Sequence, residues 1–205
     1  MNRIKSLIKE NSNLIIRLFV THIGMIIFGT VLATASASYD NILMFVSLFS
    51  ICFYMALLYV SAWEQGSKDV IRADAGRIPH RPCLGFLLGA VASSVGFLLV
   101  FLMLIGYFFG YAPLHSDFGM GLYGVCRVII AFWQAPYLGL AGTFFSTGTV
   151  YTVFGAVVTR ECYYLVNMLF YFLTTLPAVA FSGIGYLFGY KNFRIFSPMS
   201  RNTKK

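Results

Sequence analysis

The chain has 205 residues, of which 59% are hydrophobic and only 11% charged, and its mean hydropathy is +0.77. Soluble domains carry about 25% charged and about 45–50% apolar residues. The composition therefore excludes a disordered chain, a disulfide-stapled secreted module and an ordinary soluble enzyme. It predicts an all-α fold, a polytopic transmembrane helical bundle.

Long intervals without any charged residue give the expected membrane spans. A helix needs about 20 residues to cross a hydrocarbon core of about 30 Å. In a soluble fold, the faces exposed to water would interrupt such intervals with polar residues. We predict a single membrane domain over 1–205, with six spans near 14–35, 42–62, 85–111, 121–139, 143–159 and 163–189.

The stretch 121–159 allows two layouts. Its uncharged part, 128–159, is too long for one crossing and short for two, and it is interrupted by Pro136, Gly139 and Gly142. It forms either two short spans or a re-entrant hairpin that enters and leaves on the same side, which gives four spans in all. The hairpin requires other helices around it, because backbone at membrane depth must be covered by protein. Six spans are the first expectation.

Lysine and arginine residues gather before residue 18, in the loop 63–84 and in the tail 190–205. Basic residues in short loops mark the cytoplasmic side. An even number of spans puts all three segments on that side, so we expect a multi-pass protein of the plasma (inner) membrane with both termini cytoplasmic. The net charge of +8 then reflects topology and contact with the lipid bilayer. The basic residues show no motif for binding nucleic acid, and we expect no such partner.

The first span also allows a different interpretation. A basic start, an apolar stretch and the small residues 33–37 resemble a secretory signal that is cleaved after Ala37. The late position of Arg17 and the length of the apolar stretch argue against cleavage. If cleavage occurs, the mature chain begins outside and loses one span.

The loop 63–84 is predicted to start as a helix that continues the second span and stops at Gly76. Opposite charges three and four residues apart would pair along that helix. The loop either docks a cytoplasmic partner or contacts lipid head groups, or is simply a solvated connection. The candidate docking residues are Trp63, Lys68, Asp69, Arg72, Arg77 and Arg81.

A tryptophan, a glycine, a lysine–aspartate pair and a later glycine–arginine pair follow one another in this loop. They are Trp63, Gly66, Lys68, Asp69, Gly76 and Arg77. This order resembles a loop in an uncharacterised family of small bacterial multi-spanning membrane proteins, and the resemblance implies no activity. Separately, the size and the six-span layout are similar to the substrate-binding membrane subunits of energy-coupling-factor vitamin transporters. That likeness is architectural, because no ligand-binding residue can be matched.

Pairs of glycines four residues apart indicate close packing between helices, since they line one helix face and let two backbones approach. The candidate packing residues are Gly85 with Gly89, Gly106 with Gly110, and Gly185 with Gly189. The segment 119–124 matches a GxGxxG pattern, but the dinucleotide mechanism needs a preceding strand, so we expect no cofactor there.

The four cysteines are too few and too scattered for a disulfide framework, and no cysteine or histidine spacing indicates a metal site. Cys126 and Cys162 both fall near the expected outer interface. Either a bridge between them or ordinary packing within helices is compatible with the sequence.

Polar residues within the expected spans are the candidates for a functional site, because they are costly in lipid. His22 lies two turns inside the first span and needs a hydrogen-bond partner or a wet cavity. We take His22, Gln134 and Asn167 as the candidate lining of a polar cavity.

No acid, base, nucleophile and metal ligands form a recognisable catalytic set, so we expect no catalytic, cofactor-binding or metal residues. The first hypothesis is a non-enzymatic accessory or assembly subunit that binds other membrane proteins. The alternative is a small-solute transporter or the substrate-binding subunit of one. A membrane-embedded enzyme comes third.

Overall fold

The structure is a computed structural model that describes residues 7–36, 40–111, 115–147 and 150–193. The cleavage position after Ala37 and the tail from residue 194 onward lie outside the described residues. The described chain is mainly helical, in agreement with the expected class of fold.

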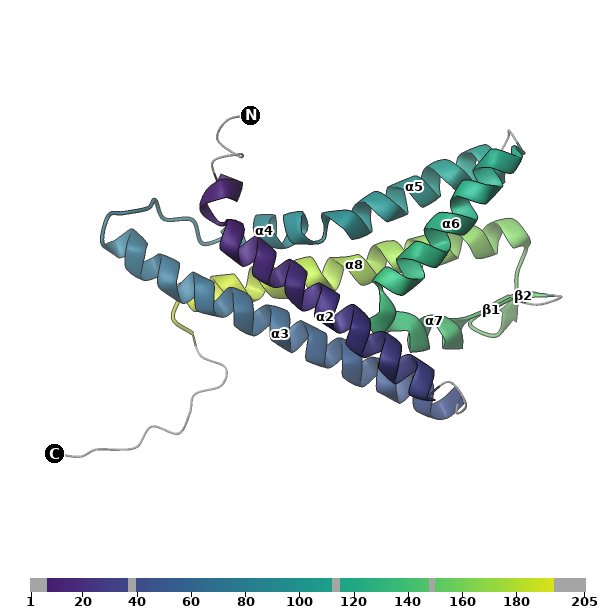
Figure 1. The fold of residues 1–205 in the computed structure, drawn as a ribbon, viewed down its shortest axis with the longest axis horizontal. Coiled ribbons are helices and arrows are strands. Elements are labelled where there is room, and N and C mark those ends of the chain that lie inside the picture. Colours follow the sequence, from purple (N-terminus) through teal and green to yellow (C-terminus); the bar gives the residue numbers. More distant parts are fainter. Residues whose placement is uncertain (1–6, 37–39, 112–114, 148–149, 194–205) are drawn as a thin grey trace.

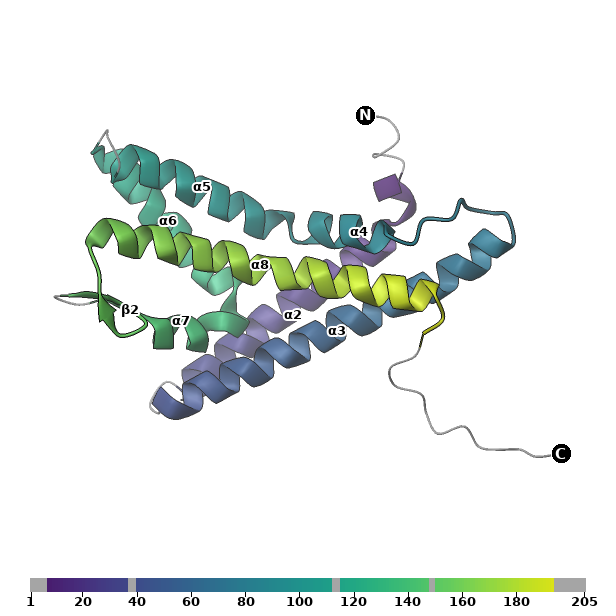
Figure 2. The ribbon, with the colours of Figure 1, turned by 180° about the vertical axis from the view of Figure 1, so that it is seen from behind.

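Four helical rods run along the long axis of the molecule, side by side (Figures 1 and 2). They are α2 (Ser12–Ser36), α3 (Asp40–Asp74), the bent pair α4 (Leu84–Ala92) with α5 (Ser94–Gly110), and α8 (Arg160–Tyr190). By length and hydropathy, the described residues contain three helices able to cross a membrane, or up to five if each bent helix pair counts as one span. The protein is therefore built as a membrane-embedded bundle, and the expected six spans are not confirmed.

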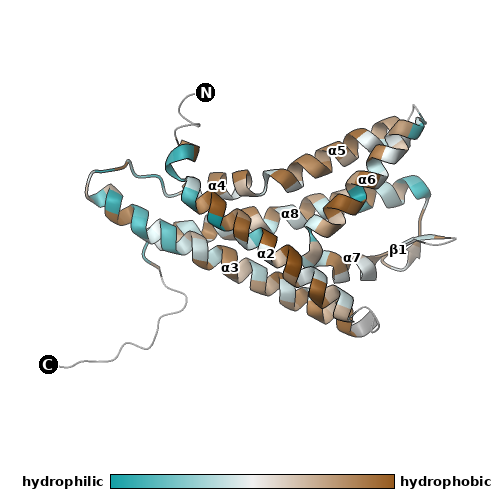
Figure 3. Ribbon diagram, viewed as in Figure 1, coloured by the Kyte–Doolittle hydropathy of each residue, from teal (hydrophilic) through white to brown (hydrophobic). Residues whose placement is uncertain are grey.

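Hydrophobic residues cover the middle of the rods, and hydrophilic residues gather at the start of α2 and the far end of α3 (Figure 3). Many large apolar side chains on the outside are exposed, among them Phe45, Phe101 and Val128. In water, so much exposed apolar surface would drive aggregation, whereas lipid accepts it.

The segment 117–144 does not run the length of the bundle. Helix α6 (Asp117–Trp133) starts beside the end of α5 and runs back to the middle, where the short 3₁₀ helix η1 (Ala135–Tyr137) turns the chain. Helix α7 (Leu138–Phe144) then returns towards the end from which α6 came, after a bend of 88° (Figures 1 and 2). Pro136 accounts for the break, because proline lacks the N–H of a continuing helix and clashes with the carbonyl four residues earlier.

A small antiparallel sheet stands where the sequence suggested a fifth span at 143–159. Strands β1 (Phe145–Thr147), β2 (Tyr151–Val153) and β3 (Ala156–Val157) pair in the order β1-β2-β3, with Phe145 opposite Val153. The described residues of 145–159 contain no helix, so the prediction of a helical span there is wrong. Uncharged strands at a membrane surface and an uncharged helix within it look alike by hydropathy alone.

The second predicted span extends well into the predicted loop. Helix α3 continues to Asp74 and projects beyond its neighbours (Figure 1). The helix ends where the sequence placed its end, since Gly76 takes a φ of +70°, a left-handed conformation that favours glycine. The third predicted span, in contrast, is bent by 57° at Ser93.

The six paired glycines all lie against another helix of the same chain. Gly85 and Gly89 of α4 face α8, and Gly106 and Gly110 of α5 face α6. A Cβ on Gly185 of α8 would lie 2.5 Å from the Tyr59 carbonyl oxygen of α3, and one on Gly189 would meet the Trp63 carbonyl. Such approaches explain the glycine spacing without a second protein.

Labelling from the two sides of the membrane distinguishes the folded-back α6–α7 segment from two separate spans. In a chain whose native cysteines are replaced, we expect the exposed Gly142→Cys to react with a membrane-impermeant maleimide added outside intact cells, because α7 returns to the end where α6 begins. Cys162 alone is the outside control and Cys83 alone the inside control, and both thiols are exposed. Reaction of Gly142→Cys only after cells are opened supports the six-span layout instead.

Candidate functional site

A small polar site lies at mid-length of the bundle, where the two broken elements meet the three long helices. The turn after α6 brings Trp133 and Gln134, and the bend between α4 and α5 brings Ser93. A cavity of about 20 Å³ lies between them, which is room for about one water molecule. The polar residues that line it are His22, Tyr54, Ser93, Gln134, Tyr137, Thr174 and Thr175.

Gln134 joins the turn to α8. Its side-chain nitrogen donates to the Tyr171 carbonyl oxygen at 3.0 Å and to the Thr175 hydroxyl at 2.7 Å, while its side-chain oxygen accepts from the Thr174 hydroxyl. Gln134 is only 4% exposed. Because the amide is buried, these contacts hold the tip of the α6–α7 segment against α8.

His22 joins α2 to α3. Its Nδ1 lies 2.7 Å from the Tyr54 hydroxyl, and its ring centroid lies 4.8 Å from that of Trp133. Two buried polar atoms of the site, His22 Nε2 and the Tyr137 hydroxyl, make no hydrogen bond of normal geometry with the described protein. Buried polar groups normally have partners. The site therefore offers polar atoms to a small guest.

The structure brings two of the three candidate cavity residues together. His22 and Gln134 line the same cavity, whereas Asn167 does not. Asn167 lies about two turns before Thr174 on α8 and is 2% exposed, with a buried side-chain oxygen that has no hydrogen bond within the described residues. Tyr54 is one of the lining residues that the sequence analysis did not place at the site, with Ser93, Tyr137, Thr174 and Thr175. The sequence feature that could have indicated Tyr54 is a hydroxyl group at the centre of an expected span.

The candidate docking residues divide into internal and exposed ones. Asp69 is 2% exposed: the Tyr186 hydroxyl donates to its Oδ2 at 2.9 Å, and Gln65 donates to its Oδ1 at 3.0 Å. The Trp63 indole donates to the Phe193 carbonyl at 2.8 Å. Asp69 and Trp63 thus join the end of α3 to the end of α8.

The basic members of the loop lie nearer to solvent. Lys68 contacts Glu64 at 2.7 Å, and Arg72 contacts Asp69 at 3.4 Å. Arg77 is exposed, and Arg81 lines a small pocket of about 30 Å³ beside Asp69. A partner could therefore reach the arginines, but not the buried aspartate.

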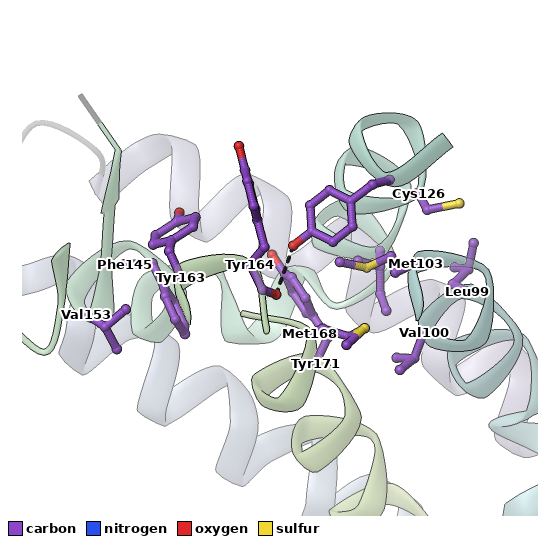
Figure 4. Close-up of a cluster of buried hydrophobic side chains, with 12 residues drawn as sticks. Leu99, Val100, Met103, Cys126, Phe145, Val153, Tyr163, Tyr164, Met168 and Tyr171 are labelled. Carbon is purple, nitrogen blue, oxygen red and sulfur yellow. Dashed lines mark hydrogen bonds between the residues drawn. The ribbon is translucent and has the colours of Figure 1, made fainter. Parts of the chain in front are cut away.

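At the opposite end of the bundle, tyrosines form a packed aromatic cluster. Rings from α6, β1 and α8 meet there, and the Tyr123 hydroxyl donates to the Tyr164 carbonyl at 3.1 Å (Figure 4). Arg127 reaches Tyr163 at 2.8 Å, and Arg160 reaches Tyr164 at 3.2 Å. Cys126, buried in this cluster, and Cys162, which is exposed, are both free thiols, so no bridge joins them.

No protein-family model, curated protein or solved structure matches the chain. The two resemblances seen in the sequence therefore supply no function, and the site has to be judged from its own geometry.

Replacement of Gln134 tests whether its amide holds the turn. Gln134→Leu leaves the Thr174 and Thr175 hydroxyls with fewer partners, and we expect the free energy of unfolding in mixed micelles to fall by about 1–2 kcal/mol. Thr34→Val is the control, since the exposed Thr34 hydroxyl bonds only to carbonyls of its own helix. The control should change stability by less than about 0.5 kcal/mol. Equal losses in the two variants would contradict a special role for Gln134.

Proposed function

We propose that the protein is a transport protein of the plasma membrane that carries a small polar solute past the site between His22 and Gln134. In this proposal α2, α3, α4 with α5, and α8 cross the membrane, and α6 to α7 forms a re-entrant hairpin. Both termini are cytoplasmic in this proposal, because the basic segments adjoin the start of α2 and the ends of α3 and α8, which lie at one end of the bundle (Figure 1).

The meeting of two discontinuous helical elements at one polar site is the observation that carries the proposal. Transport proteins typically bind substrates and ions near the membrane midplane, at breaks where backbone groups are released from the helix. Here the break at Ser93 and the break at Gln134 adjoin one cavity. Polar side chains at this depth are costly, and a purely structural bundle has no need of so many in one place.

The size of the cavity limits the size of the solute and indicates which state of the transport cycle the structure corresponds to. At about 20 Å³, it accepts little more than one water molecule. The geometry thus corresponds to a closed form, and transport requires the hairpin and α8 to separate at the Gln134 contacts. The proposed solute is small, and it is either uncharged or singly protonated. This follows from the described lining, which has hydroxyl, amide and imidazole groups but no acidic or basic residue besides His22.

Cysteine accessibility tests transport without knowledge of the solute. In a chain without native cysteines, we expect Thr174→Cys to react with a small water-soluble methanethiosulfonate reagent in proteoliposomes, since a transport cycle opens the site to water. Native Cys52 alone is the matched control, because it lies at similar depth but is exposed on the outer surface of α3. Failure of Thr174→Cys to react from either side, while Cys162 alone reacts, would contradict a transport path.

An accessory or assembly subunit is the second candidate function, and one observation favours it. The projecting end of α3 carries Ile71, which is 70% exposed although it lies beyond the expected span, close to the exposed Arg77. In this second proposal, a partner protein docked on this end of α3 buries Ile71. The six paired glycines give no support, because contacts within the chain already use them.

Purification in mild detergent followed by mass spectrometry checks this second function. A stoichiometric protein partner that is lost in Ile71→Ser and retained in Ile16→Ser supports it, since Ile16 is also exposed but lies on the lipid-facing part of α2. A partner retained in both variants, or the recovery of the protein alone, would argue against docking through α3.

A further inference from the structure

The imidazole ring of His22 at the polar site has one paired and one unpaired nitrogen. Its Nδ1 lies 2.7 Å from the Tyr54 hydroxyl of α3, whereas Nε2 is buried and makes no hydrogen bond of normal geometry with the described protein. Tyr137 is 6% exposed, and its hydroxyl is also unpaired within the described residues. Both side chains line the cavity of about 20 Å³. Unpaired buried polar atoms beside a cavity of this size indicate that the site receives a small guest.

Among the described residues, no charged side chain lines the cavity beside the His22 ring. Tyr54 on α3 and Tyr137 on η1 are the titratable groups that share the cavity with it, and the described parts of α4, α5, α6 and α8 add none to the lining. The nearest charge on α2 itself is Arg17, more than one turn earlier, and it pairs with Glu64 at 2.6 Å. An unpaired buried charge is costly. A proton on His22 therefore requires water or a guest in the site.

The Tyr54 hydroxyl lets the ring gain a proton while α2 and α3 stay in contact. A neutral imidazole carries one N–H, and an imidazolium carries two. A phenol hydroxyl can donate to Nδ1 of the neutral ring and accept from the Nδ1–H of the charged one. The charged ring has an N–H at Nε2 as well, and this atom has no acceptor of normal geometry among the described residues. Protonation thus changes what the site binds and leaves the contact between the two helices in place.

Proton binding and opening of the site are therefore linked. The closed site has room for about one water molecule, which solvates a charged ring far less than open water does. A protonated His22 consequently stabilises the form in which the Gln134 contacts with α8 are released and water enters. A solute that accepts a hydrogen bond from Nε2 can take the place of this water, so that the site closes with both the solute and the proton bound.

We propose that the protein is a proton-coupled transporter in which His22 binds the coupling proton at the polar site. Proton coupling rests on the transport function proposed above and adds the ion that drives it. His22 takes a proton from water on one side of the membrane while the site is open, and it releases that proton to water on the other side together with the solute. Intramembrane histidines are typical members of proton pathways. A histidine with a structural role alone is expected to have both ring nitrogens paired.

The pH dependence of access to the site tests proton coupling. In proteoliposomes without added solute, a chain without native cysteines that carries Thr174→Cys is exposed to a small water-soluble methanethiosulfonate reagent. Its reaction rate is divided by that of the same chain with His22→Asn, whose amide keeps a partner for Tyr54 but does not titrate. Because both chains share the Thr174→Cys thiol, the ratio removes the effect of pH on that thiol. We expect the ratio to rise about tenfold from about pH 7.5 to about pH 5.5, as for an ordinary imidazole that binds a proton in the open form only.

A second histidine–tyrosine pair provides the matched control. His80 Nδ1 lies 2.6 Å from the Tyr190 hydroxyl, but His80 is exposed in the loop before α4. His80→Asn in the Thr174→Cys chain should therefore leave the rise intact. If His22→Asn does not fold, His22→Gln gives the same comparison, since its amide also does not titrate.

The outcomes separate proton coupling from transport itself. Proton coupling is overturned if the rate ratio does not change with pH, or if His80→Asn removes the rise as His22→Asn does. In both cases transport stands, because Thr174→Cys still reacts. Absence of reaction of Thr174→Cys at every pH, while Cys162 alone reacts, overturns transport and proton coupling together.

Discussion

The whole arrangement depends on the rule that backbone and side-chain polar groups in lipid must find partners within the protein. A chain that turns back at mid-depth breaks this rule unless other helices enclose the turn. Here α2 and α3 pack against η1, and Ser47 of α3 donates a hydrogen bond to the Pro136 carbonyl at 2.6 Å. The amide of Gln134 supplies the corresponding contacts to α8. The polar site thus lies where the turn is enclosed, beside a cavity of about 20 Å³.

Much of this layout could be predicted from the sequence, because long runs of apolar residues without charges indicate helices able to cross a membrane. The long helices, the end of α3 at Gly76 and the break near Pro136 all have local signals: an uncharged run, a glycine in a left-handed conformation and a missing N–H donor. The path of the chain after Pro136 has no such local signal in the sequence. Whether a chain continues across the membrane or turns back depends on contacts with Leu43 and Ser47, which are far away in the sequence.

The candidate site could be predicted only in part, because local signals in the sequence do not show which residues meet in space. His22 and Gln134 stand out as polar residues in apolar runs, but no sequence pattern shows that they share a cavity while Asn167 lies elsewhere. Asp69 is the opposite case. Its charge and its basic neighbours indicate an exposed helix face, yet the Tyr186 hydroxyl of α8 covers it. A buried aspartate differs from an exposed one only through its tertiary partners, which here lie more than a hundred residues away.

Helix α8 follows the α6–α7 segment in the chain, and this order determines when that segment gains its partners on α8. This helix packs on α3 and α4, closes the aromatic cluster and receives the hydrogen bonds of Gln134. During synthesis the α6–α7 segment emerges before α8, so the Gln134 amide lacks its Tyr171, Thr174 and Thr175 partners until α8 is made. A product that stops before α8 leaves the Gln134 amide without these contacts, and an unpaired polar group in lipid is costly.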